Sequence, residues 1–541
     1  MQTAPSSLYH DNLQTWIRQH KEETDVAAQL DQHADALTIL MSLNLEPVRR
    51  LLMRCYAPSP RGGDPWDPIV LLRCLLLALL VGIPSVNKLV PALRGSSVLR
   101  ALAGLFDPAS DAEIQVLNAT PGVGTFYDLL HRLHDGARPL GVAGYVRPSV
   151  VERRAASTPR PPGNEPKVSN KGRKKGRPAP EAPAADGKPS ERTLKELRRT
   201  RDSRNPDDFL GRMADLLWVL AVRPSAERGL LGDGTSLIVA GDGSPLVTGA
   251  SGHGVRSCTC NPRKSCDCPR RYADPDARSG WDAYRKAYFF GHHFYEINAP
   301  SQGHDLPLAI RLDPGNTGDH TASLLVLERV QRHLRDEEPG IKIDLFIADM
   351  GHDGAATYAF CGDHGIRPVI PLNGAPARHP TRPEIKLGDR GIPLCPASIE
   401  MAAWGSGGEG RPAFICPVKA GKLATCPLAP KEDPAWLCQP DTKYGPVTTV
   451  STSDDPRLFP AIHRNSATFT DTYKLRTSCE RSNSVKKCRF KLEQARHRRA
   501  SFWLIRLHLI AVLQHASAWV AGQDARARVR ALLEPPMLLA A

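Results

Sequence analysis

Three acidic residues stand where a carboxylate could take part in chemistry. Asp242 follows a short apolar run, SLIVA, and has a glycine on each side; Asp349 follows the run IDLFIA; Glu480 opens a helical pattern. Neighbouring strands end at one edge of an open sheet, and a helix across the sheet can add a third carboxylate there. Such oxygen donors suit Mg²⁺ or Mn²⁺, and two ions would support in-line phosphoryl transfer. The alternative is three ordinary strand-end or capping residues among 57 acidic ones.

The residues around Glu480 favour the chemical interpretation. The spacing Y-x2-R-x3-E-x6-K places four side chains on one face of a helix, namely Tyr473, Arg476, Glu480 and Lys487. Segment 473–499 holds 10 Lys and Arg against 2 Glu, a positive surface of the kind that binds a DNA backbone. A solvated basic helix is the alternative.

The cysteines suggest a second site. Loop 256–270 carries four thiols within eleven residues, Cys258, Cys260, Cys266 and Cys268. They could hold a structural Zn²⁺, although the C-x-C pairs are tighter than ordinary zinc-finger spacing, and free thiols are the alternative. Cys395, Cys416, Cys426 and Cys438 are more widely spaced, so we expect them to be buried free thiols.

The elements that must position the carboxylates follow from the pattern after residue 206. Strands are predicted at 236–240, 287–297, 306–312, 343–348 and 367–371, with one helix beginning near Asp319 or Thr321 and another after Asp349. A long irregular stretch covers 372–470, and a helix is predicted over 478–520. The order β-β-β-α-β-α-β indicates an α/β domain.

The N-terminal part has a different character. Residues 1–146 show helical spacing, including a pair of short helices compatible with a helix-turn-helix, and they predict an all-helical domain that could bind DNA. Residues 147–205 hold 17 Lys and Arg against 7 Asp and Glu, which indicates a flexible basic linker. Arg177 within KGRKKGRPAP could enter an A·T minor groove, or simply touch phosphates.

Composition limits the class of protein. The chain has 541 residues and a net charge of 71 − 57 = +14, which favours a polyanionic partner such as nucleic acid, with a solvated basic surface as the alternative. A hydrophobic fraction of 41% excludes a wholly disordered chain. The sequence has neither a secretory signal pattern nor an apolar run of membrane-spanning length, so we expect a cytoplasmic protein, associated with the nucleoid when bound.

Over residues 206–520 the sequence resembles the bacterial insertion-sequence transposases that carry a DDE triad on an RNase H-like fold and a YREK signature. The match rests on Tyr473, Arg476, Glu480 and Lys487 downstream of two strand-end aspartates. The resemblance implies that Asp242, Asp349 and Glu480 are catalytic metal ligands, and that Tyr473, Arg476 and Lys487 hold phosphates near the cleaved end. It also implies a DNA transposase that binds terminal inverted repeats and cleaves and joins double-stranded DNA, as a homodimer on transposon ends and target.

The implied architecture is a multidomain α/β chain. It comprises a helical DNA-binding domain (1–146), a linker (147–205), a mixed-sheet catalytic core (206–371 and 471–541) and an insertion domain (372–470). In the insertion, Trp404 and Trp436 could stack a flipped base, or could be core residues. Two rival functions remain: a non-catalytic DNA-binding protein on a decayed transposase scaffold, and a stand-alone nuclease of the same fold. His292, His293 and His352 are expected to be structural.

Overall fold

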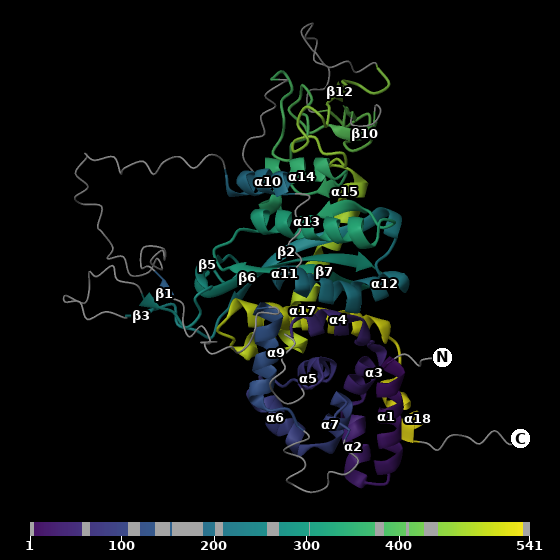
Figure 1. The fold of residues 1–541 in the computed structure, drawn as a ribbon. Helices are drawn as coiled ribbons and strands as arrows, with labels where there is room; N and C mark the ends of the chain where they lie inside the picture. The colour runs from purple at the N-terminus through teal and green to yellow at the C-terminus, as the bar shows by residue number, and fades with distance from the viewer. Residues whose placement is uncertain are drawn as a thin grey trace, which may run out of the picture.

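The structure is a computed structural model of the 541-residue chain. It describes residues 5–56, 65–106, 120–135, 152–153, 188–200, 209–256, 270–301, 303–373, 383–406, 411–426 and 442–533. Figure 1 shows a helical lower part, a sheet with helices in the middle, and a small region of strands at the top.

The lower part is built from the N-terminal helices. They are α1 (Pro5–His20), α2 (Thr24–Gln32), α3 (Ala34–Ser42), η1 (Glu46–Val48), α4 (Arg49–Arg54), α5 (Pro68–Leu80), α6 (Val86–Gly95), α7 (Ser97–Ala103) and α9 (Val123–Asp135). α5 is buried almost all round because it is nearly all apolar. Asp67 caps α5 by accepting a hydrogen bond from the Ile69 N–H. Arg73 is the single charged residue within α5, and its guanidinium carbon lies 3.8 Å from the ring centroid of Tyr9.

The middle part contains one mixed, six-stranded sheet. Its strands are β2 (Leu237–Val247), β5 (Arg278–Asp282), β6 (Ala287–Ser301), β7 (His304–Pro314), β8 (Ile343–Ile347) and β9 (Arg367–Val369). The order is β5-β6-β2-β8-β9, with β7 also paired to β6. β2 is antiparallel to β6 and parallel to β8, which is parallel to β9. Five of these strands were predicted; β5 was not.

Helices cover both faces of this sheet. α13 (Asp319–Glu337) and α16 (Thr477–Ser484) each contact β2, β6 and β7. Because side chains alternate along a strand, Gly243 faces Asp319 at the start of α13, whereas Glu296 faces Lys486 just after α16. The two helices therefore lie on opposite faces.

α17 (Ala500–Trp519) joins the helical part to the sheet. It contacts α3, α5 and α9 on one side and β7 on the other, and it is apolar nearly all round, as a fully buried helix should be. α11 (Phe209–Leu217) packs against it, and the chain continues through η3 (Trp218–Val222), α12 (Arg223–Glu227) and η4 (Gly234–Ser236) into β2. After α17, α18 (Ala525–Leu533) packs against α3 and α1. The first and last parts of the chain thus share one core.

The region expected to be an insertion contains a small sheet of its own. β10 (Ala402–Ser406), β11 (Pro412–Ile415) and β12 (Thr448–Thr449) pair in that order around a separate apolar cluster. Cys395 and Cys416 are buried free thiols, as expected, whereas Cys426 is half-buried. A further small sheet joins β1 (Glu152–Arg153), β4 (Arg270–Arg271) and β3 (Val255–Arg256).

Part of the expected flexible linker is helical. Residues 188–200 lie within segment 147–205, and they contain α10 (Pro189–Thr200), which packs on α13 and α14 (Ala355–Asp363). Leu194 is buried on the packed face, and Arg198 donates to the Asp363 carboxylate at 2.7 Å. The segment is mostly basic, but it contains one apolar stripe. A helix with such a stripe is stable when the stripe packs against a partner surface.

The predicted continuous helix over 478–520 is also wrong. α15 (Ala467–Tyr473), η6 (Lys474–Arg476), α16 and η7 (Val485–Arg489) follow one another, but the chain then turns through η8 (Leu492–Ala495) before α17 begins. Lys491 and Arg496 flank η8 with left-handed φ angles of 48° and 49°, which a continuous helix excludes. None of the helices in the described part of the chain is long and apolar enough to cross a membrane.

Candidate functional site

Asp242 lies in the middle of β2, not at its end as the sequence suggested. β2 continues to Val247, antiparallel to β6, with Asp242 opposite Glu296. The flanking glycines are required by packing. A Cβ at Gly241 would come within 2.3 Å of the Tyr295 hydroxyl, and one at Gly243 within 2.1 Å of the Asp319 carboxylate.

Asp349 lies just beyond the end of β8, as predicted. It is the N-cap of the short helix η5 (Met350–His352) and accepts a hydrogen bond from the Gly351 N–H at 2.9 Å. His352 Nδ1 lies 2.7 Å from the same carboxylate oxygen, and its Nε2 lies 2.9 Å from the Tyr295 hydroxyl. The hydrogen bond from His352 is the main reason why the pKa of Asp349 is lowered. His352 is thus fully buried and satisfied, and it orients Asp349.

Asp319 is a third acidic residue of this region that sequence reasoning treated only as a helix cap. The N-cap of α13 is instead Gly318, and the Asp319 carboxylate lies 3.0 Å from His293 Nε2. Burial acts to raise the pKa of Asp319, but the hydrogen bond and charge of His293 outweigh it, so the pKa is lowered. The only signal in the sequence was an acidic residue opening a helix, which many helices share.

The three aspartates are close enough to perturb one another. The pKa of Asp242 is raised to about 7, first by burial and then by the negative charges of Asp319 and Asp349. Arg476 and His352 oppose this rise. The arrangement is a set of crowded carboxylates in which one remains partly protonated at neutral pH, and such perturbed groups are frequent in functional sites.

Glu480 is connected to Asp242 and Asp349 by Arg476 and Tyr473. Arg476 Nη2 donates to Glu480 Oε1 at 2.5 Å, and the Arg476 guanidinium lies 6.0 Å from the Tyr473 ring centroid. The pKa of Tyr473 is raised by burial and, more weakly, by the negative charges of Asp349, Glu480 and Asp242. Tyr473 and Arg476 therefore lie among all three carboxylates that the sequence singled out.

Lys487 points elsewhere, toward the strand that carries Asp242. Its Nζ donates to the Ser244 hydroxyl at 2.7 Å and lies 3.7 Å from Glu493. Its neighbour Lys486 is fully buried and lies 2.5 Å from Glu296, which is also fully buried. Both lysines belong to η7, whose π-helical turn is a local irregularity often found at functional sites.

No closed metal cage is formed in the part of the chain that the structure describes, since no group of three His, Cys, Asp or Glu side chains there is arranged to hold an ion. Asp349 is bonded to His352, and Glu480 to Arg476. The carboxylate oxygens are nevertheless the hard donors that Mg²⁺ or Mn²⁺ prefers. Asp319 and Asp349 also place negative charge beside Asp242, which a bound cation would offset.

Other predicted residues contribute less to this site. His292 is buried against Asp274 at 2.9 Å, a structural pair. Trp404 is exposed and lies 5.3 Å from the Tyr444 ring, within the small sheet region. Four Cys residues of the proposed zinc loop (Cys258, Cys260, Cys266 and Cys268), Cys438, Trp436 and Arg177 lie outside the described residues.

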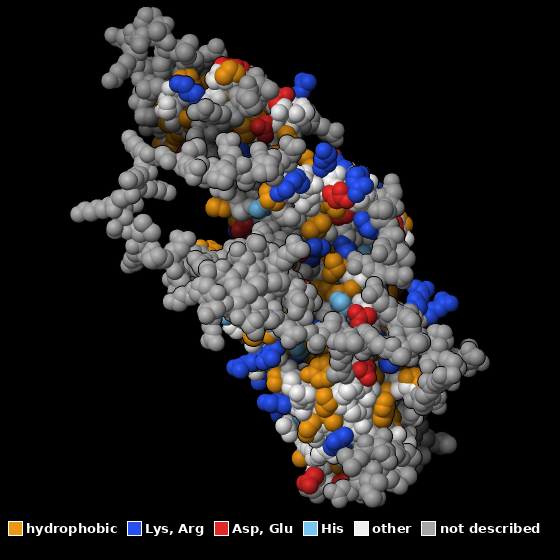
Figure 2. All heavy atoms as spheres, turned by 60° about the vertical axis from the view of Figure 1, so that its left-hand side comes forward, with side chains coloured by type: hydrophobic (Ala, Val, Ile, Leu, Met, Phe, Trp, Pro, Cys, Tyr) orange, Lys and Arg blue, Asp and Glu red, His pale blue; other side chains and the backbone are white. Residues whose placement is uncertain are grey.

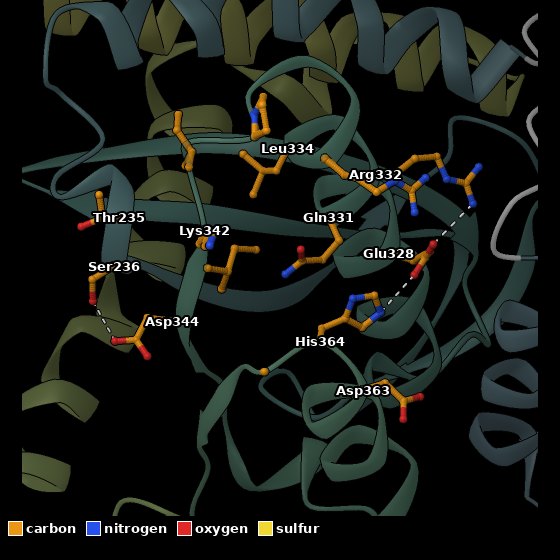
Figure 3. A pocket seen from close by; sticks show the side chains of 15 residues that line it. Thr235, Ser236, Glu328, Gln331, Arg332, Leu334, Lys342, Asp344, Asp363 and His364 are labelled. Atoms are coloured by element: carbon orange, nitrogen blue, oxygen red, sulfur yellow. Dashed lines mark hydrogen bonds and ion pairs between the residues drawn. The ribbon is translucent and has the colours of Figure 1, made fainter.

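A cavity of about 740 Å³ lies at the other end of the sheet, where β2 and β8 begin (Figure 3). Three of its lining residues pair with one another: Glu328 lies 3.6 Å from Arg332 and 3.4 Å from His364. None of the predicted catalytic residues lines it. On the outer surface, Figure 2 shows Lys and Arg side chains distributed along the face that comes forward there.

A model of the transposase DDE domain family matches residues 226–513, which is more than half of the 541-residue chain. The matched region begins before β2 and ends within α17, so it includes Asp242, Asp349 and Glu480. Comparison with curated proteins and with solved structures finds no match.

Proposed function

The chain belongs to the transposase DDE domain family, and we propose that it cleaves and joins DNA with the carboxylates of Asp242, Asp349 and Glu480. It is a DDE transposase, a polynucleotidyl transferase with endonuclease activity, and its partner is DNA. The observation that supports the site assignment best is the position of Arg476, because it donates to Glu480 at 2.5 Å and its charge also acts on Asp242, which lies beside Asp319 and Asp349.

Enzymes of this family generally use divalent metal ions. We propose Mg²⁺ or Mn²⁺ here, held by Asp242, Asp349 and Glu480, because these are hard oxygen donors and because Asp319 and Asp349 add negative charge beside the buried Asp242. When bound, two such ions supply an activated oxygen nucleophile and stabilise the leaving oxygen of a phosphodiester. Asp319 is a further acidic group beside this set, and it acts on Asp242 through its charge.

The remaining residues prepare the site. His352 orients Asp349, and Tyr295 in turn fixes the ring of His352 by hydrogen bonding at 2.9 Å. Arg476 holds Glu480 in the DNA-free protein. A backbone phosphate would compete for this guanidinium, because Arg binds phosphate in a two-pronged geometry, and Glu480 would then be released toward the aspartates. Binding of DNA and completion of the site would thus be coupled.

Lys487 and Tyr473 complete the proposed phosphate contacts. Lys487 Nζ lies 2.7 Å from Ser244, two residues along β2 from Asp242, so a phosphate bound there would be close to the catalytic strand. Together with Arg476 and Glu480 they match the spacing of the YREK signature, and we assign the chain to the bacterial insertion-sequence transposases that carry it.

The wider architecture is proposed on the same basis. The sheet order supports an RNase H-like core formed by residues 206–371 and 471–541, with residues 372–470 as an insertion domain that has its own apolar cluster. We propose that the helical region 1–146 and the basic segment 147–205, including Arg177, bind the terminal inverted repeats. A homodimer would then bring two transposon ends together, and a Zn²⁺ could be held in loop 256–270.

Cleavage and strand transfer on labelled DNA that carries the sequences flanking the gene would test this proposal. We expect nicking at defined ends and then joining with Mg²⁺, but not with Ca²⁺. Asp349→Asn and Glu480→Gln should abolish both reactions and leave DNA binding nearly intact, because they remove ligand charge without removing cationic surface.

The matched control is Asp344→Asn, which changes an acidic residue of β8, the strand that leads to Asp349; Asp344 accepts a hydrogen bond from Arg367. It should retain cleavage. Cleavage without joining would indicate a nuclease, and tight binding without cleavage in any metal would indicate a non-catalytic DNA-binding protein. Equal loss of binding and cleavage in Asp349→Asn would contradict the assigned role.

A further inference from the structure

The hairpin between β5 and β6 carries an exposed aromatic and cationic surface. The exposed fractions are 96% for Tyr284, 54% for Trp281 and 52% for Tyr288. Arg285 and Lys286 at the tip are exposed as well. Contiguous exposed apolar groups on a soluble protein usually mark an interaction site, since leaving them in water is unfavourable. The hairpin is therefore a candidate binding element.

The conformation of the tip is held by a buried carboxylate. Asp282 Oδ1 accepts hydrogen bonds from the backbone N–H groups of Tyr284 and Arg285, both at 3.0 Å. Lys286 adopts a left-handed φ of 50°, which closes the turn. Asp282 is the single acidic residue in segment 281–288, and it is buried. Arg285 Nη1 also lies 3.7 Å from the second oxygen of Asp282, and about half of the Arg285 side chain stays exposed. The tip thus presents two cations and a tyrosine ring without any exposed negative charge.

The other two aromatic residues form a platform behind the tip. Trp281 and Tyr288 are directly opposite each other in the β5–β6 register, and their ring centroids lie 4.8 Å apart in an edge-to-face arrangement. Aromatic surfaces interleaved with cations are typical of sites for nucleic-acid strands, because bases stack on the rings and phosphates pair with the cations.

The hairpin aromatic Tyr288 lies on the same face of the sheet as α16, the helix that carries Glu480. Tyr288 shares a face of β6 with Glu296, which contacts Lys486 of η7. Because a strand rises about 3.3 Å per residue, Tyr288 lies at most about 26 Å along β6 from the position opposite Asp242. That span corresponds to about eight base pairs of DNA.

Cations lie near both ends of this distance. Burial lowers the pKa of Lys487. The negative charges of Glu493 and Asp282 oppose this shift and the positive charge of Arg285 adds to it, so the hairpin tip and Lys487 lie near each other. Lys487 in turn contacts Ser244 on the strand of Asp242. The proposed phosphate site and the hairpin tip therefore each carry a cation, Lys487 and Arg285, with Glu493 and the buried Asp282 beside them.

We propose that this hairpin is a DNA-binding element of the catalytic core, in which Arg285 and Lys286 contact phosphates and Tyr284 stacks on an unpaired nucleobase near the cleaved end. The proposal rests on the proposed function, which requires DNA at the neighbouring carboxylates. A duplex hides the faces of its bases, whereas a cut or distorted end exposes them, so a fully exposed ring favours an unpaired nucleotide.

Fluorescence anisotropy in a Glu480→Gln background would test this, because binding is then measured without cleavage. The probes are a blunt duplex of the flanking sequence, the same duplex with unpaired terminal nucleotides, and an unrelated duplex with the same overhang. Tyr284→Ala should weaken binding of the end-sequence overhang probe by about 5- to 150-fold, the usual range for one lost stacking contact, and leave the blunt duplex nearly unchanged. Tyr284→Phe, which keeps the ring, should bind like the parent.

The cations have a separate readout. The double variant Arg285→Ala/Lys286→Ala should reduce the slope of log affinity against log salt by about two, since each phosphate contact contributes about 0.9. Arg335→Ala/Lys342→Ala is the matched control, because both cations are exposed near the start of β8, away from Asp349. These side chains are exposed, and the ion pairs that they make, Arg285 with Asp282 and Arg335 with Asp336, are of the exposed kind that contributes at most about 1 kcal/mol, so the unfolding temperature should change little in either double variant.

An effect of Tyr284→Ala on the end-sequence overhang alone would support contact with the transposon end, and an effect on both overhang probes would support general contact that includes target DNA. Equal affinity of Tyr284→Ala and Tyr284→Phe on every probe would overturn the stacking, and an unchanged salt slope would overturn the phosphate contacts. If the parent binds no DNA at all, the proposed function fails together with the hairpin proposal.

Discussion

Replacing Lys486 by methionine should destabilise the protein far more than replacing its neighbour Lys487. Lys486 and Glu296 are both fully buried and lie 2.5 Å apart. Lys486 Nζ also donates to Ser482 at 2.7 Å, and Asn298 donates to the other oxygen of Glu296 at 3.0 Å. The pair therefore joins η7, which directly continues the helix that carries Glu480, to the strand beside Asp242.

The magnitude follows from what the substitution leaves behind. Lys486→Met keeps the apolar stem but leaves the Glu296 carboxylate buried without a counter-charge, and such a loss costs about 3–5 kcal/mol. Lys487 makes a partly exposed 3.7 Å contact with Glu493 and donates to the Ser244 hydroxyl at 2.7 Å. Neither contact leaves a fully buried charge behind, so Lys487→Met should cost no more than about 2 kcal/mol. A combined Lys486→Met/Glu296→Leu variant removes both charges and should recover most of the loss.

Urea unfolding followed by tryptophan fluorescence would measure these differences from the shift in midpoint at constant slope. Equal stability of Lys486→Met and Lys487→Met would refute the reasoning, as would a double variant that is less stable than Lys486→Met alone. Single-turnover cleavage below the unfolding transition supplies a second readout. If the pair positions Glu480, the double variant should regain stability without regaining the full rate.

Three further outcomes follow from the structure. Asp319→Asn removes a negative charge beside Asp242, so the pKa of Asp242 should fall below about 7, and the acidic limb of the pH profile of cleavage should move to lower pH; an unchanged limb would contradict the coupling. Burial lowers the pKa values of His508 and His515 from 6.5 to about 4. Between these two pH values the unfolded state therefore binds more protons than the folded state. The free energy of unfolding should then fall between pH 6.5 and pH 4, by about 3 kcal/mol for each residue. Urea midpoints at several pH values check this, and a flat profile would count against neutral buried rings. Arg198→Ala breaks an exposed ion pair that helps hold α10, so we expect a loss of at most about 1 kcal/mol and faster amide exchange in α10.

The sequence predicted the course of the sheet well, because strand and helix periods are local properties. The strands that include Val239, Phe294 and Phe346 were all located from short apolar runs between turn residues. The helix beginning near Asp319 and the N-terminal helices were located in the same way. Where the pattern was interrupted by polar residues inside a buried strand, as at Asp242, the strand was predicted to end too early.

Features that depend on a distant partner were missed. α10 was hidden in a basic segment because its single apolar stripe is stable only against α13 and α14. The break around Lys491 lies in a sequence with no glycine or proline to mark it. Asp319 was indistinguishable from an ordinary cap, and Lys486 from its solvated neighbours, until the sheet supplied His293 and Glu296.

The sequence by itself determined the chemical types available, namely acidic residues after buried runs and a spaced Tyr, Arg, Glu and Lys, together with the order of the elements that carry them. The tertiary structure alone decided which carboxylates approach one another, which charges are buried and which aromatic rings stay in water. The physical reason is that periodicity and capping act over a few residues, whereas burial, pKa shifts and ion pairing depend on groups brought together from distant parts of the chain. Asp242 illustrates both: its strand was readable from SLIVA, but its pKa of about 7 arises from burial and from Asp319 and Asp349, which are 77 and 107 residues away.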